Sequence, residues 1–290
     1  MRQWNGSTFG NGWMHTQLVR ILRHVDARVL YLFSDIFIVP VCLVLNRSRK
    51  TAFAFYRDIL GYGTLKACWA TYRNHCCFSQ VVIDRFAMYA GKSFDIVVEG
   101  MDVFNELASG EEGFLHLSSH IGNYEIAGYS LVSDRKKIHA VVYSHEKESV
   151  MRNRDGMFSR TNISMIALKD DMSHLYEIDN AICAGDIVSF PTDRFMEGAK
   201  FIEAPFFGRN AKFPLGPFSV ATMRSVNVLA VNVMKEGTNG YRIYVTPLSY
   251  DKSAPRKVQI EQLCRGYVDE LQKRVAQYPL QWYNFFDFWA

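Results

Sequence analysis

The stretch FLHLSSHIGNYE, residues 114–125, decides how this chain folds. Its first five residues, FLHLS, form a short apolar run that is typical of a buried β-strand ending near residue 118. Gly122 then lets the backbone turn sharply, and Asn123 is expected to cap a helix at about residues 123–132. A strand that leads straight into a helix indicates an open α/β sheet. In such sheets, reactive side chains gather beyond the carboxyl ends of the strands.

Similar runs on both sides of this stretch continue the strand–helix alternation. Strands are predicted at residues 94–99, 138–143, 163–168, 187–190, 226–233 and 241–246. Further helices are predicted at residues 172–184, 217–224 and 257–277. This alternation predicts the α/β class, with a central sheet that carries helices on its faces.

The chain before residue 91 has a different pattern, in which apolar residues recur at helical spacing. We therefore expect residues 1–90 to form an N-terminal helical, membrane-associated region. Residues 91–290 are expected to form the α/β core, continuous with that region in one domain.

The membrane expectation rests on the apolar segment at residues 29–45, which Ser34, Asp35 and Pro40 interrupt. A spanning helix needs about 20 apolar residues, so a buried or interfacial helical hairpin is favoured over a true span. Arg47, Arg49 and Lys50 follow directly and would suit anionic headgroups.

Composition narrows the classes of partner. The formal net charge is +4, which favours an anionic membrane surface or an acidic carrier. No basic run or nucleic-acid motif accompanies it, so we expect no nucleic-acid partner. The six cysteines include no CxxC pair, which indicates reduced thiols and a cytosolic compartment.

His120 and Glu125 are the candidate catalytic residues. They lie five positions apart, so they would not share a face of one helix. Across a loop-to-helix corner, however, Glu125 could accept a hydrogen bond from one imidazole nitrogen of His120. The other nitrogen would take a proton from an attacking hydroxyl or amine. An alternative is a metal-dependent hydrolase that binds zinc through His116, His120 and Glu125, although the H-E-x-x-H order is absent.

The stretch HIGNYE resembles the H-x4-D/E motif of the lysophospholipid acyltransferase superfamily, and most closely its lipid A biosynthesis acyltransferase branch. Other blocks of the chain are similar to that branch in the same order. They are WNGST at residues 4–8, FPTD at 190–193, FFG at 206–208 with PLGP at 214–217, and PLQW at 279–282. The chain departs from the branch at Asp193-Arg194, where members often have Asp-Gln.

The resemblance implies a central mixed sheet flanked by helices, as in glycerol-3-phosphate acyltransferase-like folds. It implies acyl transfer from acyl carrier protein (acyl-ACP) or acyl-CoA to a hydroxyl or amine of a lipid or glycolipid, without a metal or redox cofactor. The implied location is the cytoplasmic face of the bacterial inner membrane, with peripheral or monotopic attachment. A catalytically inactive lipid-binding relative is the remaining alternative.

Five residues are candidates for substrate binding. Asp193 and Arg194 come just after a predicted strand, so they could face the same cleft as His120 and place the acceptor, or form a surface ion pair. Arg209 and Lys212 flank the FFG loop and could hold a phosphate or carboxylate. Asn123, at the predicted corner, is the fifth candidate.

Overall fold

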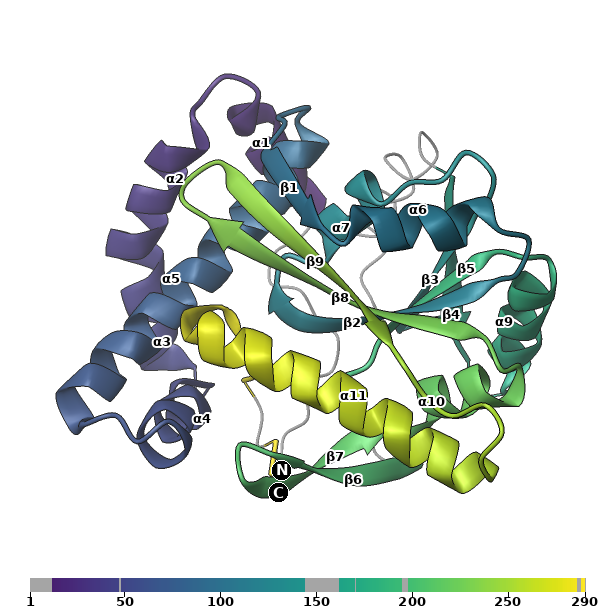
Figure 1. Cartoon of the computed structure of the whole chain (residues 1–290). Coiled ribbons are helices and arrows are strands. Elements are labelled where there is room, and N and C mark those ends of the chain that lie inside the picture. The colour runs from purple at the N-terminus through teal and green to yellow at the C-terminus, as the bar shows by residue number, and fades with distance from the viewer. Residues whose placement is uncertain are drawn as a thin grey trace.

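The computed structural model describes residues 12–46, 48–143, 162–169, 171–194, 198–285 and 288–289. The opening motif at residues 4–8 and Arg47 lie outside these ranges. Within them, a seven-stranded mixed sheet has the order β1-β9-β8-β2-β5-β3-β4 (Figure 1). Its strands are β1 (Asp95–Glu99), β2 (Phe114–Gly122), β3 (Ile138–Tyr143), β4 (Ile163–Leu168), β5 (Ile187–Pro191), β8 (Asn227–Glu236) and β9 (Gly240–Leu248).

The centre of the sheet is parallel. β2 lies between β5 and β8 and runs parallel to both, whereas β9 is antiparallel to β8. Because helices cover both faces here, β2 is buried along almost its whole length. Its alternate residues enter two cores: Leu115 and Leu117 pack on one face, and Phe114 on the other.

Helices complete these two layers (Figure 1). The core on the Phe114 face includes residues of α6 (Met101–Ser109) and α7 (Glu125–Ser130). The core on the Leu115 face includes residues of α9 (Ser173–Cys183), α10 (Leu215–Met223) and α11 (Arg256–Gln277). A separate hairpin of β6 (Phe201–Phe206) and β7 (Arg209–Pro214) packs against α11, which the short helix η3 (Pro279–Gln281) follows.

The described helices before residue 90 form a layer of their own. They are α1 (Gly12–Leu22), α2 (Ala27–Phe33), η1 (Ser34–Ile38), α3 (Val39–Leu45), α4 (Ser48–Ala54), η2 (Phe55–Ile59) and α5 (Thr64–Tyr89). The 26-residue helix α5 packs against all the others. Phe55, Ala67 and Ala70 of this layer belong to the same hydrophobic core as Leu115 and Leu117, so the helical layer and the sheet are packed as one unit.

A buried ionic cluster ties this layer to the sheet. The carboxylate of Asp84, on α5, binds the ammonium of Lys235, on β8. It also accepts hydrogen bonds from Tyr31, on α2, and Tyr241, on β9. Burial raises the pKa of Asp84 above its usual value even though Lys235 and the two tyrosines oppose that shift.

The strands predicted from the sequence are confirmed, but two features differ. Helix α6 and the β6–β7 hairpin were not predicted. The strands of the hairpin contain Pro205 and Pro214, which weaken a strand signal. Its turn is formed by Phe207 and Gly208, which both have positive φ, as a two-residue type I′ hairpin turn requires.

Candidate active site

The corner after the central strand is built on Gly122. The predicted end of this strand at residue 118 is wrong, because β2 continues to Gly122 with a shift of register against β8. Gly122 has φ +59°, and a Cβ at this position would lie 1.8 Å from the carbonyl oxygen of Val233. Only glycine fits such a close approach to a neighbouring strand. The irregular stretch presents His120 at the carboxyl edge of the sheet.

Asp193 is the hydrogen-bond partner of the His120 ring. The ring nitrogen Nδ1 lies 2.7 Å from Asp193 Oδ1, and the backbone N–H of His120 donates to Asp193 Oδ2 at 2.8 Å. The two residues meet because β2 and β5 are parallel neighbours. The backbone N–H of Thr192 donates to the carbonyl of Ser118, which holds the two strand ends together. The expected proximity of Asp193 to His120 is therefore present.

The charge of Asp193 is fixed by its surroundings. Its side chain is 2% exposed, and that burial opposes ionisation. The His120 ring, Arg194 and the His120 backbone N–H outweigh burial and hold the pKa of Asp193 below its usual value. An ionised carboxylate accepts from Nδ1–H, so the neutral ring carries its proton on Nδ1 and presents Nε2 as the basic nitrogen.

Glu125 has other partners in this structure. Its carboxylate oxygen Oε1 lies 3.1 Å from Arg85 Nε, and Tyr89 donates to Oε2 at 3.1 Å. The sequence predicts that Glu125 orients the imidazole through a hydrogen bond. At Nδ1 of the ring, however, the hydrogen-bond partner is Asp193. The physical reason is that Glu125 begins α7, and its side chain meets the facing helix α5.

Asn123 lies beneath the corner and is 1% exposed. Its backbone N–H donates to the Val233 carbonyl at 2.9 Å, and its side-chain amide donates to the Tyr241 hydroxyl at 3.4 Å. The prediction that Asn123 caps the helix is wrong, because Tyr124 is the N-cap residue and makes no side-chain cap hydrogen bond.

The segment after η3 forms a further wall of the site, which the sequence did not reveal. Ile121 pairs with Trp282 in an antiparallel bridge, and the backbone N–H of Tyr283 donates to the His120 carbonyl at 3.2 Å. Arg194 donates to the Tyr283 carbonyl at 2.8 Å, so it braces this segment beside Asp193. Trp282 and Tyr283 are buried, and the segment is packed on the sheet.

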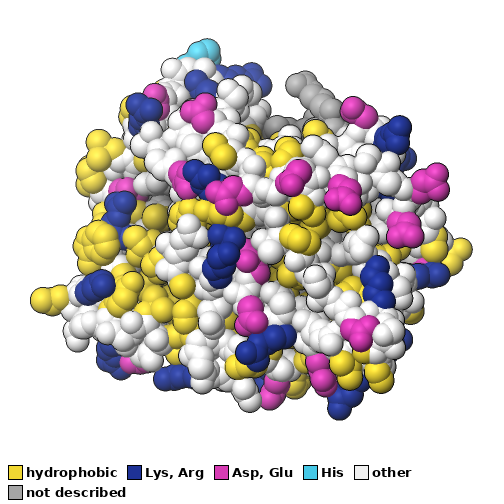
Figure 2. Space-filling model, viewed as in Figure 1, with side chains coloured by type: hydrophobic (Ala, Val, Ile, Leu, Met, Phe, Trp, Pro, Cys, Tyr) yellow, Lys and Arg dark blue, Asp and Glu magenta, His cyan; other side chains and the backbone are white. Residues whose placement is uncertain are grey.

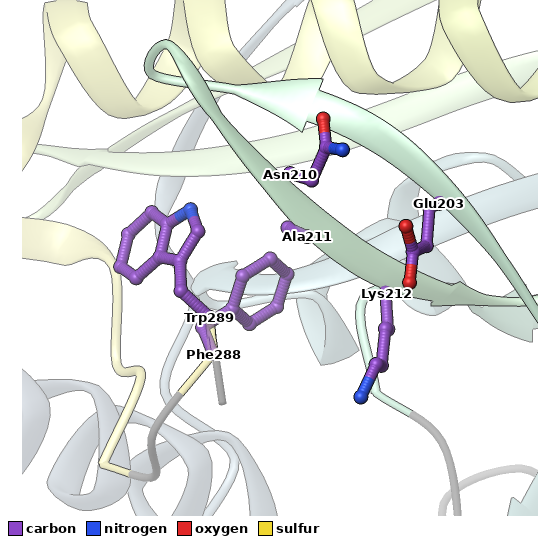
Figure 3. Close-up of a pocket in the computed structure, with 6 residues that line it drawn as sticks. All are labelled: Glu203, Asn210, Ala211, Lys212, Phe288 and Trp289. Atoms are coloured by element: carbon purple, nitrogen blue, oxygen red, sulfur yellow. The ribbon is translucent and has the colours of Figure 1, made fainter.

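Arg209 and Lys212 lie on the β6–β7 hairpin rather than on the seven-stranded sheet. Arg209 donates to the carbonyl of Asp58, and the Lys212 ammonium lies 5.1 Å from the centre of the Phe201 ring. Lys212 also lines a small pocket of the hairpin, opposite the rings of two aromatic residues (Figure 3). The pocket residues are Glu203, Asn210, Ala211, Lys212, Phe288 and Trp289.

The alternative zinc site finds no support in the described part of the chain. No three His, Cys, Asp or Glu side chains among the described residues lie close enough to hold a metal ion. His116 lies inside β2, between Ser189 and Leu229 of the neighbouring strands, and burial lowers its pKa to about 4. It is a core residue.

An imidazole lies beyond the carboxyl ends of parallel strands, hydrogen-bonded to a buried carboxylate. This arrangement is suited to an enzyme that uses general acid–base catalysis. Comparison with known sequences identifies the family. The profile of the bacterial lipid A biosynthesis acyltransferases matches residues 82–290, well over half of the chain. The chain belongs to this family, and it is an acyltransferase of lipid biosynthesis.

Two further comparisons complete these findings. The chain is similar to the crystal structure of the 1-acyl-sn-glycerophosphate acyltransferase PlsC from Thermotoga maritima, with 18% identity and a TM-score of 0.37. That alignment covers 93% of this chain and 99% of the other. A search of curated proteins gave no match.

Proposed function

We propose that this acyltransferase moves a fatty acyl group from acyl-ACP or acyl-CoA onto a hydroxyl or amine of a lipid or glycolipid, with His120 as the general base. The observation that supports this most directly is the 2.7 Å contact between His120 Nδ1 and buried Asp193. Asp193 favours the tautomer in which Nε2 is the basic nitrogen, and it would stabilise the imidazolium that forms during transfer.

The proposed reaction needs no reactant other than the acceptor and the acyl thioester. The acceptor O–H or N–H gives its proton to His120 Nε2 as its oxygen or nitrogen bonds to the thioester carbonyl carbon. The carbon–sulfur bond then breaks, and the leaving thiolate takes the proton from the imidazolium. Ester or amide, free thiol and neutral imidazole remain. That the reaction uses no metal or redox cofactor stays a prediction.

We also propose that the chain docks on the cytoplasmic face of the inner membrane through α2, η1 and α3. Residues 27–45 form one apolar helical stretch of 19 residues, of which only 17% is buried. Hydrophobic side chains gather along this side of the molecule (Figure 2). The exposed ones on this stretch are Val29, Leu32, Phe33, Ile36, Phe37, Ile38, Val41, Val44 and Leu45.

The polar residues of this stretch favour attachment within one leaflet over a span. Tyr31 and Ser34 are buried against α5, where Ser34 bonds to Ser79. The Asp35 carbonyl accepts from Tyr72, also on α5. One face of the stretch is thus hydrogen-bonded to the protein, and only the other face is apolar and open. Such a helix lies in the membrane surface.

The docking face gives a direct test. We expect Phe37→Glu to weaken sedimentation with vesicles containing anionic phospholipid by about tenfold or more. A charge costs roughly 2.5–3.5 kcal/mol at the middle of a bilayer and less near its surface. Val258→Glu, at an exposed apolar position on α11, is the matched control. Equal sedimentation of both variants would rule out this face.

The function itself is tested by mass spectrometry of lipids from cells that contain the chain, lack it, or contain its His120→Ala variant. We expect one acylated species to be present only with the intact chain, and its mass identifies the acceptor and the acyl length. If the His120→Ala variant restores that species fully, the chain does not act through this base. A lipid-binding role would then explain the phenotype better.

A further inference from the structure

The carboxylate of Glu125 is clamped by two residues of α5, Arg85 and Tyr89. The Glu125 side chain is 3% exposed, and both of its carboxylate oxygens are engaged, one by Arg85 and one by Tyr89. Arg85 and Tyr89 are four positions apart on α5, so they project from the same face of that helix. A carboxylate held at both oxygens has one orientation.

The clamp reaches the proposed base through Tyr124. The ring of Tyr124 lies 5.4 Å from the His120 ring and packs edge to face against it. The guanidinium of Arg85 lies 6.0 Å from the centre of the Tyr124 ring, within the range of a cation–π contact. The imidazole is therefore bordered by Asp193 at Nδ1 and by the Tyr124 ring, which Arg85 supports.

We propose that Arg85 and Tyr89 are positioning residues for the transfer reaction. Arg85 keeps the buried Glu125 ionised, and together the two residues hold the first turn of α7, and with it Tyr124, against His120. This inference rests on the proposed function of His120. Neither residue was singled out by sequence reasoning, because α5 precedes the sheet and shows no motif.

Electrostatics supply the physical reason. An isolated buried carboxylate takes up a proton, because burial disfavours its charged form. Among the described residues, Arg85 and Tyr89 contact Glu125, the His120–Asp193 pair lies beside Tyr124, and Lys235 lies on β8, which packs against α7. Lys235 is already bound by Asp84, and Asp193 is itself negative. Among the described residues, Arg85 is a cation that lies against Glu125, at 3.1 Å.

The helix that carries the clamp also belongs to the proposed docking layer. At its other end, Leu65 and Trp69 are exposed, and along its length α5 packs against α2, η1 and α3. The position of the catalytic corner is thus set by the same helix that supports the membrane-facing surface. Arg85 and Tyr89 are the contacts through which that helix reaches Glu125.

The test compares Arg85→Ala, Arg85→Lys and Tyr89→Phe with the intact enzyme, measuring kcat and KM across pH on vesicle-bound acceptor. We expect Arg85→Ala to lower kcat about 10–100-fold near neutral pH, because it removes the ion-pair partner of a buried carboxylate. The acid limb of its profile should move to higher pH, because Glu125 must then ionise without its cation. Arg85→Lys should restore part of kcat, and Tyr89→Phe should show a smaller loss.

Arg73→Ala is the matched control. Arg73 also lies on α5, but away from the corner, and it pairs with Asp35 of η1 at 4.0 Å. A loss that is equal at every pH, or that Arg73→Ala reproduces, would overturn the positioning role. His120→Ala is measured alongside. If it stays active, the proposed function fails; if it is inactive while Arg85→Ala is normal, only the present inference fails.

Discussion

His120→Ala and Asp193→Asn are each expected to lower kcat/KM roughly 10²–10⁴-fold, the usual contribution of general base catalysis. Alanine removes the proton acceptor. Asparagine keeps the size of Asp193 but loses the charge that selects the tautomer of the ring and stabilises the imidazolium. Because the two residues act as one unit, the double variant should be no worse than the more damaged single variant. The measurement is steady-state transfer from an acyl thioester to lipid.

The chain supplies a matched control at the opposite edge of the sheet. His139 Nε2 lies 2.9 Å from Asp186, a comparable imidazole–carboxylate contact at the amino ends of β3 and β5. His139→Ala should leave kcat/KM nearly unchanged. Thermal melting of all variants separates unfolding from loss of chemistry. If Asp193→Asn is fully active and Glu125→Gln is dead, Glu125 is the orienting carboxylate after all.

Lys235→Met is expected to lower the free energy of unfolding by about 3–5 kcal/mol, the range observed when one partner of a buried ion pair is removed. The Asp84 side chain is 0% exposed and that of Lys235 is 6% exposed, so the remaining carboxylate cannot be rehydrated in the folded state. Chemical denaturation measures this loss. Lys257→Met is the control. The side chain of Lys257 is 89% exposed and lies 3.9 Å from Glu261, and such a surface ion pair contributes little to stability.

The same variant should show a defined dependence on pH. Burial already raises the pKa of Asp84, and removing Lys235 takes away the strongest opposing influence. A carboxyl whose pKa is higher in the folded than in the unfolded state weakens the fold when it ionises, so stability falls as pH rises between the two values. The loss in Lys235→Met should therefore be smaller at pH 5 than at pH 8. Adding Asp84→Asn should recover part of it, and an unchanged double variant would contradict this account.

Much of the sheet could be predicted, because strands that are buried on both faces contain short apolar runs that can be recognised in the sequence. β2, β5 and β8 each contain a short, largely apolar run, and the turn residues between elements mark their ends. The end of β2 is predicted at residue 118, four residues too early, because its extension to Gly122 depends on pairing with β8. Such pairing joins residues far apart in the sequence and has no local signal.

The site could be predicted only in part, for the same reason. His120 and Asp193 each follow an apolar strand, and parallel strands bring such positions to one edge. Which carboxylate meets the ring, however, depends on side-chain directions at an irregular strand end. Helix α5 approaches this corner through packing in three dimensions, so Arg85 and Tyr89 left no mark in the sequence near His120.

The bridge from Ile121 to Trp282 joins segments far apart in the sequence, so no short piece of this chain contains the whole candidate site. His120, Asp193 and the segment that borders them come from distant parts of the polypeptide, so they meet only when β2, β5 and the C-terminal segment have packed together. Acyltransferase activity is therefore expected only from the fully folded chain.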